Sequence, residues 1–222
     1  PPFAHLHCHS HYSLLDGANR IPNLVAKVKA DGMNELALTD HGNLFGTIEH
    51  YKACKAAGIK PIIGCEVYVA IESRHLRKAA RGLTHASNHL VLLAKNATGY
   101  RNLTKLVSKG YLEGFYYNPR IDKELLREHS EGLICMSACI GGEVPHMIQR
   151  EGYNEAEKIA REFMEIFGDD YYLEIQRHDI EPEVKVNENL LRLHDKLGIP
   201  LVATNDFHFL HADDHDAHDA LI

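Results

Sequence analysis

The sequence predicts an α/β fold, a parallel barrel of about seven strands with helices outside. Apolar, β-branched runs alternate with amphipathic helical patterns along the chain, which is typical of repeated strand–helix units. Reactive side chains follow several of the predicted strands, as they do at the mouth of a parallel barrel. An open doubly wound sheet would also fit the alternation, but no glycine-rich phosphate loop follows the first strand, which favours the barrel.

Strands are expected at Phe3–His7, Glu35–Thr39, Lys60–Val69, Leu90–Lys95, Leu133–Ala138, Tyr171–Gln176 and Leu201–Asn205. Helices are expected at residues 20–31, 44–57, 98–111, 122–129, 153–167 and 182–197, where apolar residues recur every three to four positions. Glycines just after several of these segments, at positions 58, 168 and 198, are typical of helix ends. The basic segment Ser73–Ser87 fits neither pattern and is expected to be a long mobile loop.

The composition is that of a folded globular protein, with 45% hydrophobic and 25% charged residues, and residues 1–222 are expected to form one domain. No apolar run approaches the roughly 18 residues that span a bilayer, and the first residues lack a basic segment followed by an apolar one, so neither a membrane protein nor a secreted protein is expected. The five cysteines form no CxxC pair, which favours a reducing cytoplasm over a disulfide framework. Because the chain begins without Met and ends in a predicted helix, we expect it to be a piece of a longer protein.

Histidine is unusually abundant, with 17 residues, and this favours metal or proton chemistry. The net charge is -7, but residues 74–127 hold 11 Lys and Arg against 3 Asp and Glu. Such a basic region is either a site of attraction for a phosphate-bearing ligand or simply a solvated surface.

The strongest local motif places four histidines at alternate positions, His5, His7, His9 and His11. Alternate residues of an extended chain share a face and lie about 6.6 Å apart, so several ring nitrogens can reach one cluster of metal ions. Asp206-Phe-His208 repeats the spacing in the last predicted strand region, and the two pairs become neighbours if a barrel closes.

Further candidates end or interrupt apolar strands. Asp40-His41-Gly42 follows the second strand, where His41 suits a metal ligand and Asp40 is either a ligand or a cap for the next helix. Glu66 lies within an apolar strand, where an unpaired carboxylate is costly unless it bridges cations. His89 precedes its strand and is either a ligand or a structural histidine, and Cys139 is either a zinc-binding thiolate or a buried thiol.

These motifs together resemble the PHP (polymerase and histidinol phosphatase) domain, and more narrowly the N-terminal PHP domain of bacterial DNA polymerase III alpha subunits. The resemblance rests on HLHCHSHYSLLDG, ALTDHGN, GCEVYV, NHLVLLAKN, NPRID, SACIGGE and ATNDFHFL, and it covers nearly the whole chain. It implies a distorted seven-stranded (βα)7 TIM-like barrel with up to three divalent ions, Zn, Mn or Fe. The implied ligands are His7, His9, Asp16, His41, Glu66, His89, Cys139, Asp206 and His208.

The resemblance also implies a metal-dependent phosphodiesterase that trims the 3′ end of single-stranded DNA as a proofreading exonuclease. Glu66 would bridge two metals, Asp206 would orient the attacking water, and Arg120 would hold a phosphate oxygen unless it forms a surface salt bridge. The expected partners are DNA, the remaining domains of the polymerase chain and replisome subunits. His5 stands where many stand-alone members have Asp. Two alternatives stay open, a histidinol-phosphatase-like phosphomonoesterase and a metal-stabilised scaffold without activity.

Overall fold

A computed structural model describes residues 3–78 and 86–222, so residues 79–85 of the predicted loop Ser73–Ser87 lie outside the described part. The strands are β1 (Glu35–Leu38), β2 (Lys60–Ala70), β3 (Ser87–Ala94), β4 (Phe115–Tyr116), β5 (Asn118–Ile121), β6 (Leu133–Met136), β7 (Tyr171–Ile175) and β8 (Leu201–Ala203). The helices are α1 (Ile21–Ala30), α2 (Thr47–Ala57), α3 (Ala97–Leu112), α4 (Lys123–His129), α5 (Glu143–Arg150), α6 (Tyr153–Phe167), α7 (Glu181–Leu197) and α8 (His215–Asp219).

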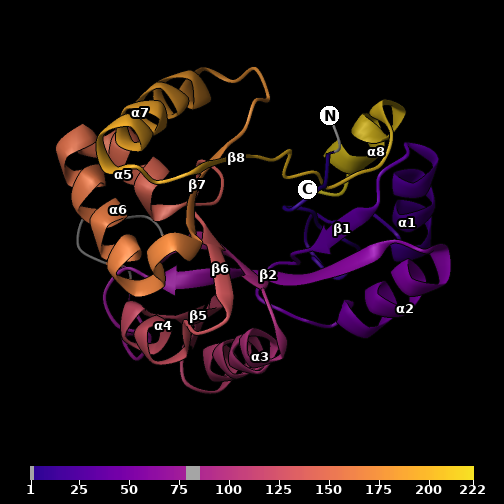
Figure 1. The fold of residues 1–222 in the computed structure, drawn as a ribbon, viewed down its shortest axis with the longest axis horizontal. Helices are drawn as coiled ribbons and strands as arrows, with labels where there is room; N and C mark the ends of the chain where they lie inside the picture. Colours follow the sequence, from indigo (N-terminus) through magenta and orange to yellow (C-terminus); the bar gives the residue numbers. More distant parts are fainter. Residues whose placement is uncertain (1–2, 79–85) are drawn as a thin grey trace.

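The strands form a curled mixed sheet with the order β4-β5-β2-β3-β6-β7-β8, and β1 pairs with β2 (Figure 1). β2 is long enough to pair with β1 along Lys60–Ile63 and with β3 along Gly64–Ala70. The predicted strand Phe3–His7 is reduced to single bridges, His5 with Leu36 and Cys8 with Phe207. These bridges place the N-terminal segment between β1 and the chain after β8. The continuous ladders thus make a half-barrel, and the closed TIM-like barrel is not confirmed.

β3 runs antiparallel to both β2 and β6, which corrects the expectation of an all-parallel sheet. A parallel neighbour needs a crossover connection, usually a helix, and no helix lies between β2 and β3 in the described residues. The reversal has a direct consequence for His89, at the start of β3. The beginning of this strand lies at the same edge as the ends of the parallel strands, so His89 joins the residues that follow those strands.

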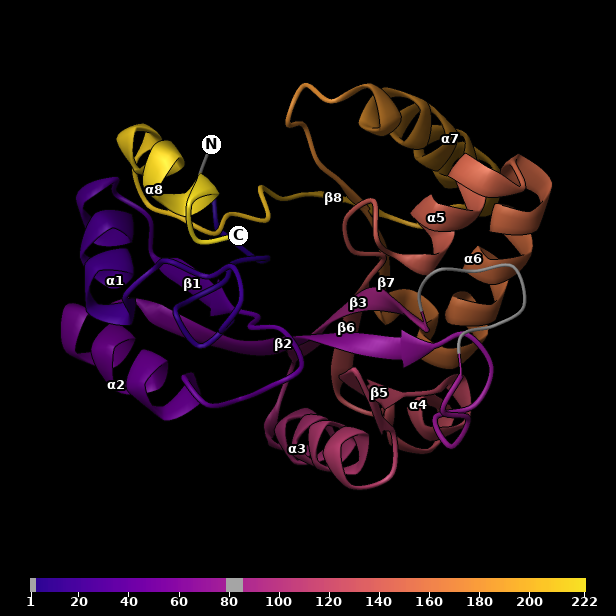
Figure 2. The same ribbon diagram turned by 180° about the vertical axis from the view of Figure 1, so that it is seen from behind.

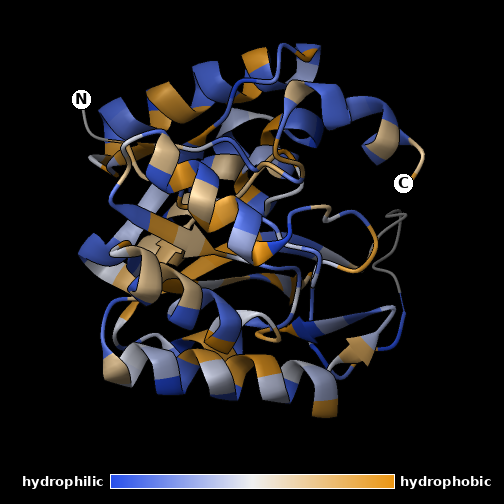
Figure 3. Ribbon diagram, turned by 90° about the vertical axis from the view of Figure 1, so that its right-hand side faces the viewer, coloured by the Kyte–Doolittle hydropathy of each residue, from blue (hydrophilic) through white to orange (hydrophobic). Residues whose placement is uncertain are grey.

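The helices pack on the outside of the sheet. α1 and α2 lie together on one side, and α5, α6 and α7 lie together on the other (Figures 1 and 2). Apolar and polar residues occupy different faces of these helices (Figure 3). No helix of the described chain is long and apolar enough to cross a membrane.

The six predicted helices all form, within about three residues of the expected limits. Three short elements were not predicted, namely β4, β5 and α5. α5 follows Gly141 and Gly142 and contains Pro145, which reads as a loop in sequence but is tolerated in the first turn of a helix.

Candidate metal centre

The nine side chains predicted as ligands come together at one edge of the sheet. They come from the N-terminal segment (His7 and His9), the next turn (Asp16), the end of β1 (His41), the middle of β2 (Glu66), the start of β3 (His89), the segment after β6 (Cys139) and the segment after β8 (Asp206 and His208). Segments that lie about 200 residues apart in sequence thus meet, because the bridge between Cys8 and Phe207 joins the N-terminal segment to the chain after β8.

Glu66 lies at the centre of this group and is buried. One carboxylate oxygen, Oε2, lies 2.7 Å from His41 Nδ1 and 3.3 Å from His9 Nε2. The other oxygen, Oε1, lies 2.7 Å from His89 Nδ1. The two oxygens therefore face different histidines, an arrangement that suits a carboxylate shared between two cations.

Asp206 forms a second acidic position beside the two N-terminal histidines. Its Oδ1 lies 3.0 Å from His9 Nε2 and 3.1 Å from His7 Nε2. The backbone of Asp206 has a φ of 46°, which is uncommon for a residue other than glycine and often marks a functional position. His208 faces the Asp206 carbonyl through Nδ1 at 3.0 Å, which leaves Nε2 directed at the cluster.

Asp16 and Cys139 close the two sides of the group. Asp16 Oδ2 lies 3.1 Å from His41 Nε2 and 3.7 Å from His208 Nε2. Cys139 Sγ lies 3.7 Å from His89 Nδ1. The cluster is thus continuous from Asp16 through Glu66 to Cys139.

Some donor atoms pair within the cluster, as His9 Nε2 does with Asp206 Oδ1 and His41 Nε2 with Asp16 Oδ2, but several others lack a contact with hydrogen-bond geometry. His7 Nε2, His41 Nδ1, Asp16 Oδ1 and both Glu66 oxygens are buried without a hydrogen-bond partner in the described part of the chain. Unpaired buried polar atoms are costly, and divalent ions would satisfy them. Three groups have ligand atoms within 4.8 Å of one another: His9, His41 and His208; His7, His9 and Glu66; and His41, Glu66 and His89. Their nitrogen and carboxylate donors, with a thiol nearby, suit zinc, manganese or iron.

Charge and burial shift the pKa values of the cluster's histidines in opposite directions. Burial alone lowers the pKa of His41, but contacts with Asp16 and Glu66 outweigh it and raise this pKa to about 10. Burial dominates at His9 and lowers its pKa to about 4. Burial opposes ionisation of Glu66, but His89 and His7 hold its pKa well below the usual range. Without metal, the cluster therefore holds protons on some rings beside an ionised carboxylate.

Metal binding should release protons, because a ring nitrogen binds a metal only without its proton. His41 keeps its proton up to about pH 10 without metal, so apparent metal affinity should increase as the pH rises from 6 towards 10. Calorimetric titration with ZnCl₂ at pH 7.5, in buffers of different ionisation enthalpy, measures the number of released protons. We expect about one or more protons per chain. A binding heat that is the same in every buffer would contradict this protonation state.

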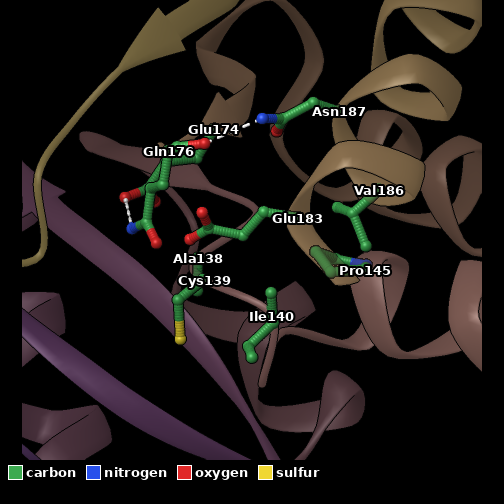
Figure 4. A pocket seen from close by; sticks show the side chains of 9 residues that line it. All are labelled: Ala138, Cys139, Ile140, Pro145, Glu174, Gln176, Glu183, Val186 and Asn187. Atoms are coloured by element: carbon green, nitrogen blue, oxygen red, sulfur yellow. Dashed lines mark hydrogen bonds between the residues drawn. The ribbon is translucent and has the colours of Figure 1, made fainter. Parts of the chain in front are cut away.

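Glu174 in β7 holds His7 in place and was not predicted from the sequence. This buried carboxylate lies 2.7 Å from His7 Nδ1, and the Thr204 hydroxyl and Gln176 Nε2 donate to the same oxygen. Carboxylates commonly fix the ring of a metal-binding histidine in this way. Figure 4 shows Glu174 and Gln176 at a small pocket with Cys139. The sequence contained a signal for this role. Glu174 is a carboxylate within an apolar strand, like Glu66, and Gln176 lies two positions further along on the same face.

Replacement Glu174→Gln should weaken metal binding by about 10- to 100-fold, because the neutral amide is a weaker acceptor for His7 Nδ1–H. Metal affinity is measured by competition with a chromogenic chelator. Glu165→Gln, on the exposed side of α6, is the matched control and should bind metal like the unmodified protein. Equal affinities for both variants would show that Glu174 only supports folding.

Asp40 is neither a helix cap nor a member of the cluster. Its carboxylate accepts from the Ser10 backbone N–H at 2.7 Å, the Ser10 hydroxyl at 2.8 Å and the Ser13 hydroxyl at 2.8 Å. The Ser13 oxygen lies 3.1 Å from His9 Nδ1 and accepts from the His41 backbone N–H. Asp40 thus fixes the turn that carries His9 and Asp16.

Arg120 has contacts that differ from the expected role as a phosphate ligand. It is buried, and it donates to the carbonyl oxygens of Gly114, Arg74 and Leu76 at 3.0, 3.1 and 2.8 Å. The ion pair expected for Arg120 belongs instead to Arg74, which binds Asp122. Arg120 therefore connects the segment after β2 to the β4–β5 hairpin, a structural role.

Two further expectations are revised by the contacts. His5 packs edge-on against Phe3 and Phe207, with ring centroids 5.0 and 4.7 Å away, and is not a member of the three ligand groups found in the described residues. Much of the basic region 74–127 is neutralised locally, as Lys123 and Arg127 both pair with Glu162. The net positive charge of this region thus overstates its attraction for phosphate.

The fold and the cluster define the class of protein to which this chain is related. Residues 5–178 match the PHP domain, and the chain belongs to this family. It is similar to DNA polymerase III subunit alpha from Borreliella burgdorferi (52% identity), Treponema pallidum (51%) and Thermus aquaticus (50%), each over 99% of this chain. The chain spans only 18–19% of the length of these relatives.

Solved structures support the fold. An amidohydrolase from Chromobacterium violaceum aligns with a TM-score of 0.60 and 16% identity, over 98% of this chain and 96% of the other. A protein assigned as a metal-dependent phosphoesterase from Bifidobacterium adolescentis aligns with a TM-score of 0.55 and 16% identity, over 93% and 87%.

Proposed function

We propose that this domain hydrolyses phosphodiester bonds with up to three bound divalent ions, zinc, manganese or iron, held by the nine side chains of the cluster. The observation that carries the proposal is the convergence of these donors, several of them buried without partners, around Glu66. The similarity to DNA polymerase III alpha subunits supports a DNA substrate. We therefore propose a 3′–5′ exonuclease that removes nucleotides from single-stranded ends as a proofreading activity.

The acidic residues of the cluster differ in burial, and this difference suits them to different roles. Bound ions would supply an activated hydroxide and neutralise charge on the phosphoryl oxygens. Glu66 is buried and faces histidines through both oxygens, which suits it to hold two ions. Asp206 is more accessible, with 13% of its side chain exposed, so it can bind an ion or orient a water molecule. Glu174 and Asp40 keep the ligand-bearing segments in place.

The relatives are about five times longer than this chain. The domains and subunits that act together with this chain are therefore also part of the proposal. We propose that the domain works in the cytoplasm, as a single unit over residues 1–222, with the remaining domains of a polymerase chain and with replisome subunits. A DNA end released from a polymerase site would then reach the metal centre without leaving the assembly.

Comparing two substrates on the metal-loaded chain tests the proposal. A single-stranded oligonucleotide labelled at its 5′ end should be shortened one nucleotide at a time from its 3′ end, as seen on a denaturing gel. Histidinol phosphate, a phosphate monoester, should be turned over much more slowly. Hydrolysis of the monoester alone would reject the exonuclease in favour of a phosphatase.

Asp206→Asn separates catalysis from a scaffold role. We expect oligonucleotide hydrolysis to fall by about 100-fold or more, because the neutral amide is a weaker metal ligand and does not orient the attacking water as the carboxylate does. Thermal unfolding with added metal measures the structural effect. If the variant unfolds at a lower temperature but keeps its full nuclease rate, Asp206 supports only the structure. This result would favour the scaffold interpretation.

A further inference from the structure

Three exposed aromatic rings form a continuous surface beside the metal centre. Phe45, Tyr111 and Phe115 are 60%, 39% and 49% exposed. The ring centroids of Phe45 and Tyr111 lie 6.4 Å apart, and those of Tyr111 and Phe115 lie 6.2 Å apart. We name these three residues the aromatic row. Phe45 comes from the loop before α2, whereas Tyr111 and Phe115 lie four residues apart, near the end of α3 and in β4.

The aromatic row begins close to the metal centre. Phe45 lies four residues after His41, in the loop that leads into α2. Tyr68 borders the cluster, because its ring is 6.2 Å from the His41 ring and 5.3 Å from the His89 ring. A side chain at Gly42 would meet the Tyr68 ring at 3.1 Å, so the loop after His41 packs directly on Tyr68.

The far end of the row is held rigidly. The carbonyl oxygen of Gly114, next to Phe115, accepts from Arg120 Nε at 3.0 Å. The Arg120 guanidinium also lies 5.1 Å from the centre of the Tyr116 ring. Tyr117, at the tip of this hairpin, is 82% exposed and has a φ of 60°, an uncommon conformation that surrounding structure must maintain. A fixed aromatic surface loses little conformational entropy when a ligand stacks on it.

The charges around the row are compatible with a phosphate backbone. Glu113 is the only acidic residue in segment 111–117, and it is neutralised by Lys109 at 2.9 Å and Arg74 at 2.7 Å. Lys52, exposed on α2 one turn after Ile48, makes no ion pair within the described residues. Stacking of bases on aromatic rings beside cationic side chains is the usual way of binding single strands without sequence preference.

We propose that the aromatic row binds the single-stranded DNA whose 3′ end enters the metal centre, by stacking on its unpaired bases. This inference rests on the proposed function, because it takes the metal centre as the place where the strand is cut. The flanking apolar side chains of Ile48 and Leu112 would also suit a protein partner. The short sequence distance between His41 and Phe45, and the packing of the loop after His41 on Tyr68, favour the strand.

Oligonucleotide affinity tests the proposal on the metal-loaded chain. The probe is a 12-nucleotide oligo(dT) with 5′ fluorescein and a phosphorothioate at its last linkage, and anisotropy measures binding. Tyr111→Ala and Phe45→Ala should each weaken binding by about 5- to 100-fold, which corresponds to the loss of one stacked base. Tyr100→Ala is the matched control, since Tyr100 lies on the same helix and is 38% exposed. It should bind like the unmodified chain.

A small phosphodiester separates this inference from the proposed function. Hydrolysis of bis(4-nitrophenyl) phosphate, which has no polynucleotide strand to extend from the metal centre along the row, should be unchanged in Tyr111→Ala. If both row variants bind the oligonucleotide like the unmodified chain and still hydrolyse the small phosphodiester, the proposed role of the aromatic row is wrong and the proposed function is unaffected. If the unmodified chain hydrolyses no phosphodiester yet loses oligonucleotide binding in Tyr111→Ala, the proposed function fails and the binding surface is supported.

A protein partner gives a different result. If the unmodified chain sediments as a dimer, Tyr111→Ala sediments as a monomer and oligonucleotide affinity stays the same, the row joins two copies of the chain. That outcome overturns the proposal. Tyr111→Phe, which keeps the ring, should retain oligonucleotide affinity and shows that any loss in Tyr111→Ala comes from the missing ring.

Discussion

Glu66→Gln should abolish cooperative metal loading and lower phosphodiester hydrolysis by about 1,000-fold, a loss of about 4 kcal/mol of transition-state stabilisation. Glu66 is the buried centre of the cluster, and its two oxygens face His41, His9 and His89. A neutral amide would direct an N–H towards one of these rings or ions and would remove the negative charge that balances them. The effect should exceed that of any other single ligand.

Metal content by elemental analysis and hydrolysis of an oligonucleotide measure this effect on the same sample. Glu72→Gln, six residues further along and outside the cluster, is the control and should retain both properties. A Glu66→Gln protein that binds the full amount of metal and hydrolyses DNA at the normal rate would show that Glu66 does not hold the ions.

Arg120→Met should lower the free energy of unfolding by about 3 kcal/mol. The guanidinium is buried and donates to three backbone carbonyl groups, and methionine would leave those acceptors without partners. Urea unfolding followed by circular dichroism measures the change. Arg101→Met, on the exposed side of α3, should alter stability by less than about 0.5 kcal/mol.

The same variant tests the earlier interpretation of Arg120 as a phosphate ligand. If Arg120→Met is as stable as the unmodified protein but loses phosphodiester hydrolysis, the guanidinium acts on the substrate. Loss of stability with normal hydrolysis at low temperature would support its role as a link between the β4–β5 hairpin and the segment after β2.

Hydrophobic periodicity was sufficient to predict the helices and most strands, because each buries an apolar face of its own. It could not predict the direction of β3, since a buried strand has the same pattern in either direction. The N-terminal segment was predicted as a strand, but its ladder is replaced by two bridges at His5 and Cys8. His7 and His9 of this segment are directed into the cluster instead.

The pattern of polar residues in the sequence indicated the candidate ligands, but not the residues whose hydrogen bonds keep those ligand side chains in position. His7 and His9 stand out because their spacing is rare, whereas the sequence positions of Glu174 and Asp40 do not show which side chains they contact. Their roles depend on contacts across the sheet, such as Glu174 with His7, 167 positions apart. The contacts of Arg120 could not be predicted for the same reason, because its acceptors are backbone oxygens that a sequence does not reveal.

The most direct test of the metal centre is a crystal structure of the chain purified without chelators, with anomalous diffraction at the zinc, manganese and iron edges. We predict about two to three ions in the space bounded by His7, Glu66, Cys139 and His208. Anomalous density at this position would establish the centre. Well-ordered side chains in the same positions, with no anomalous density between them and no metal by elemental analysis, would contradict it.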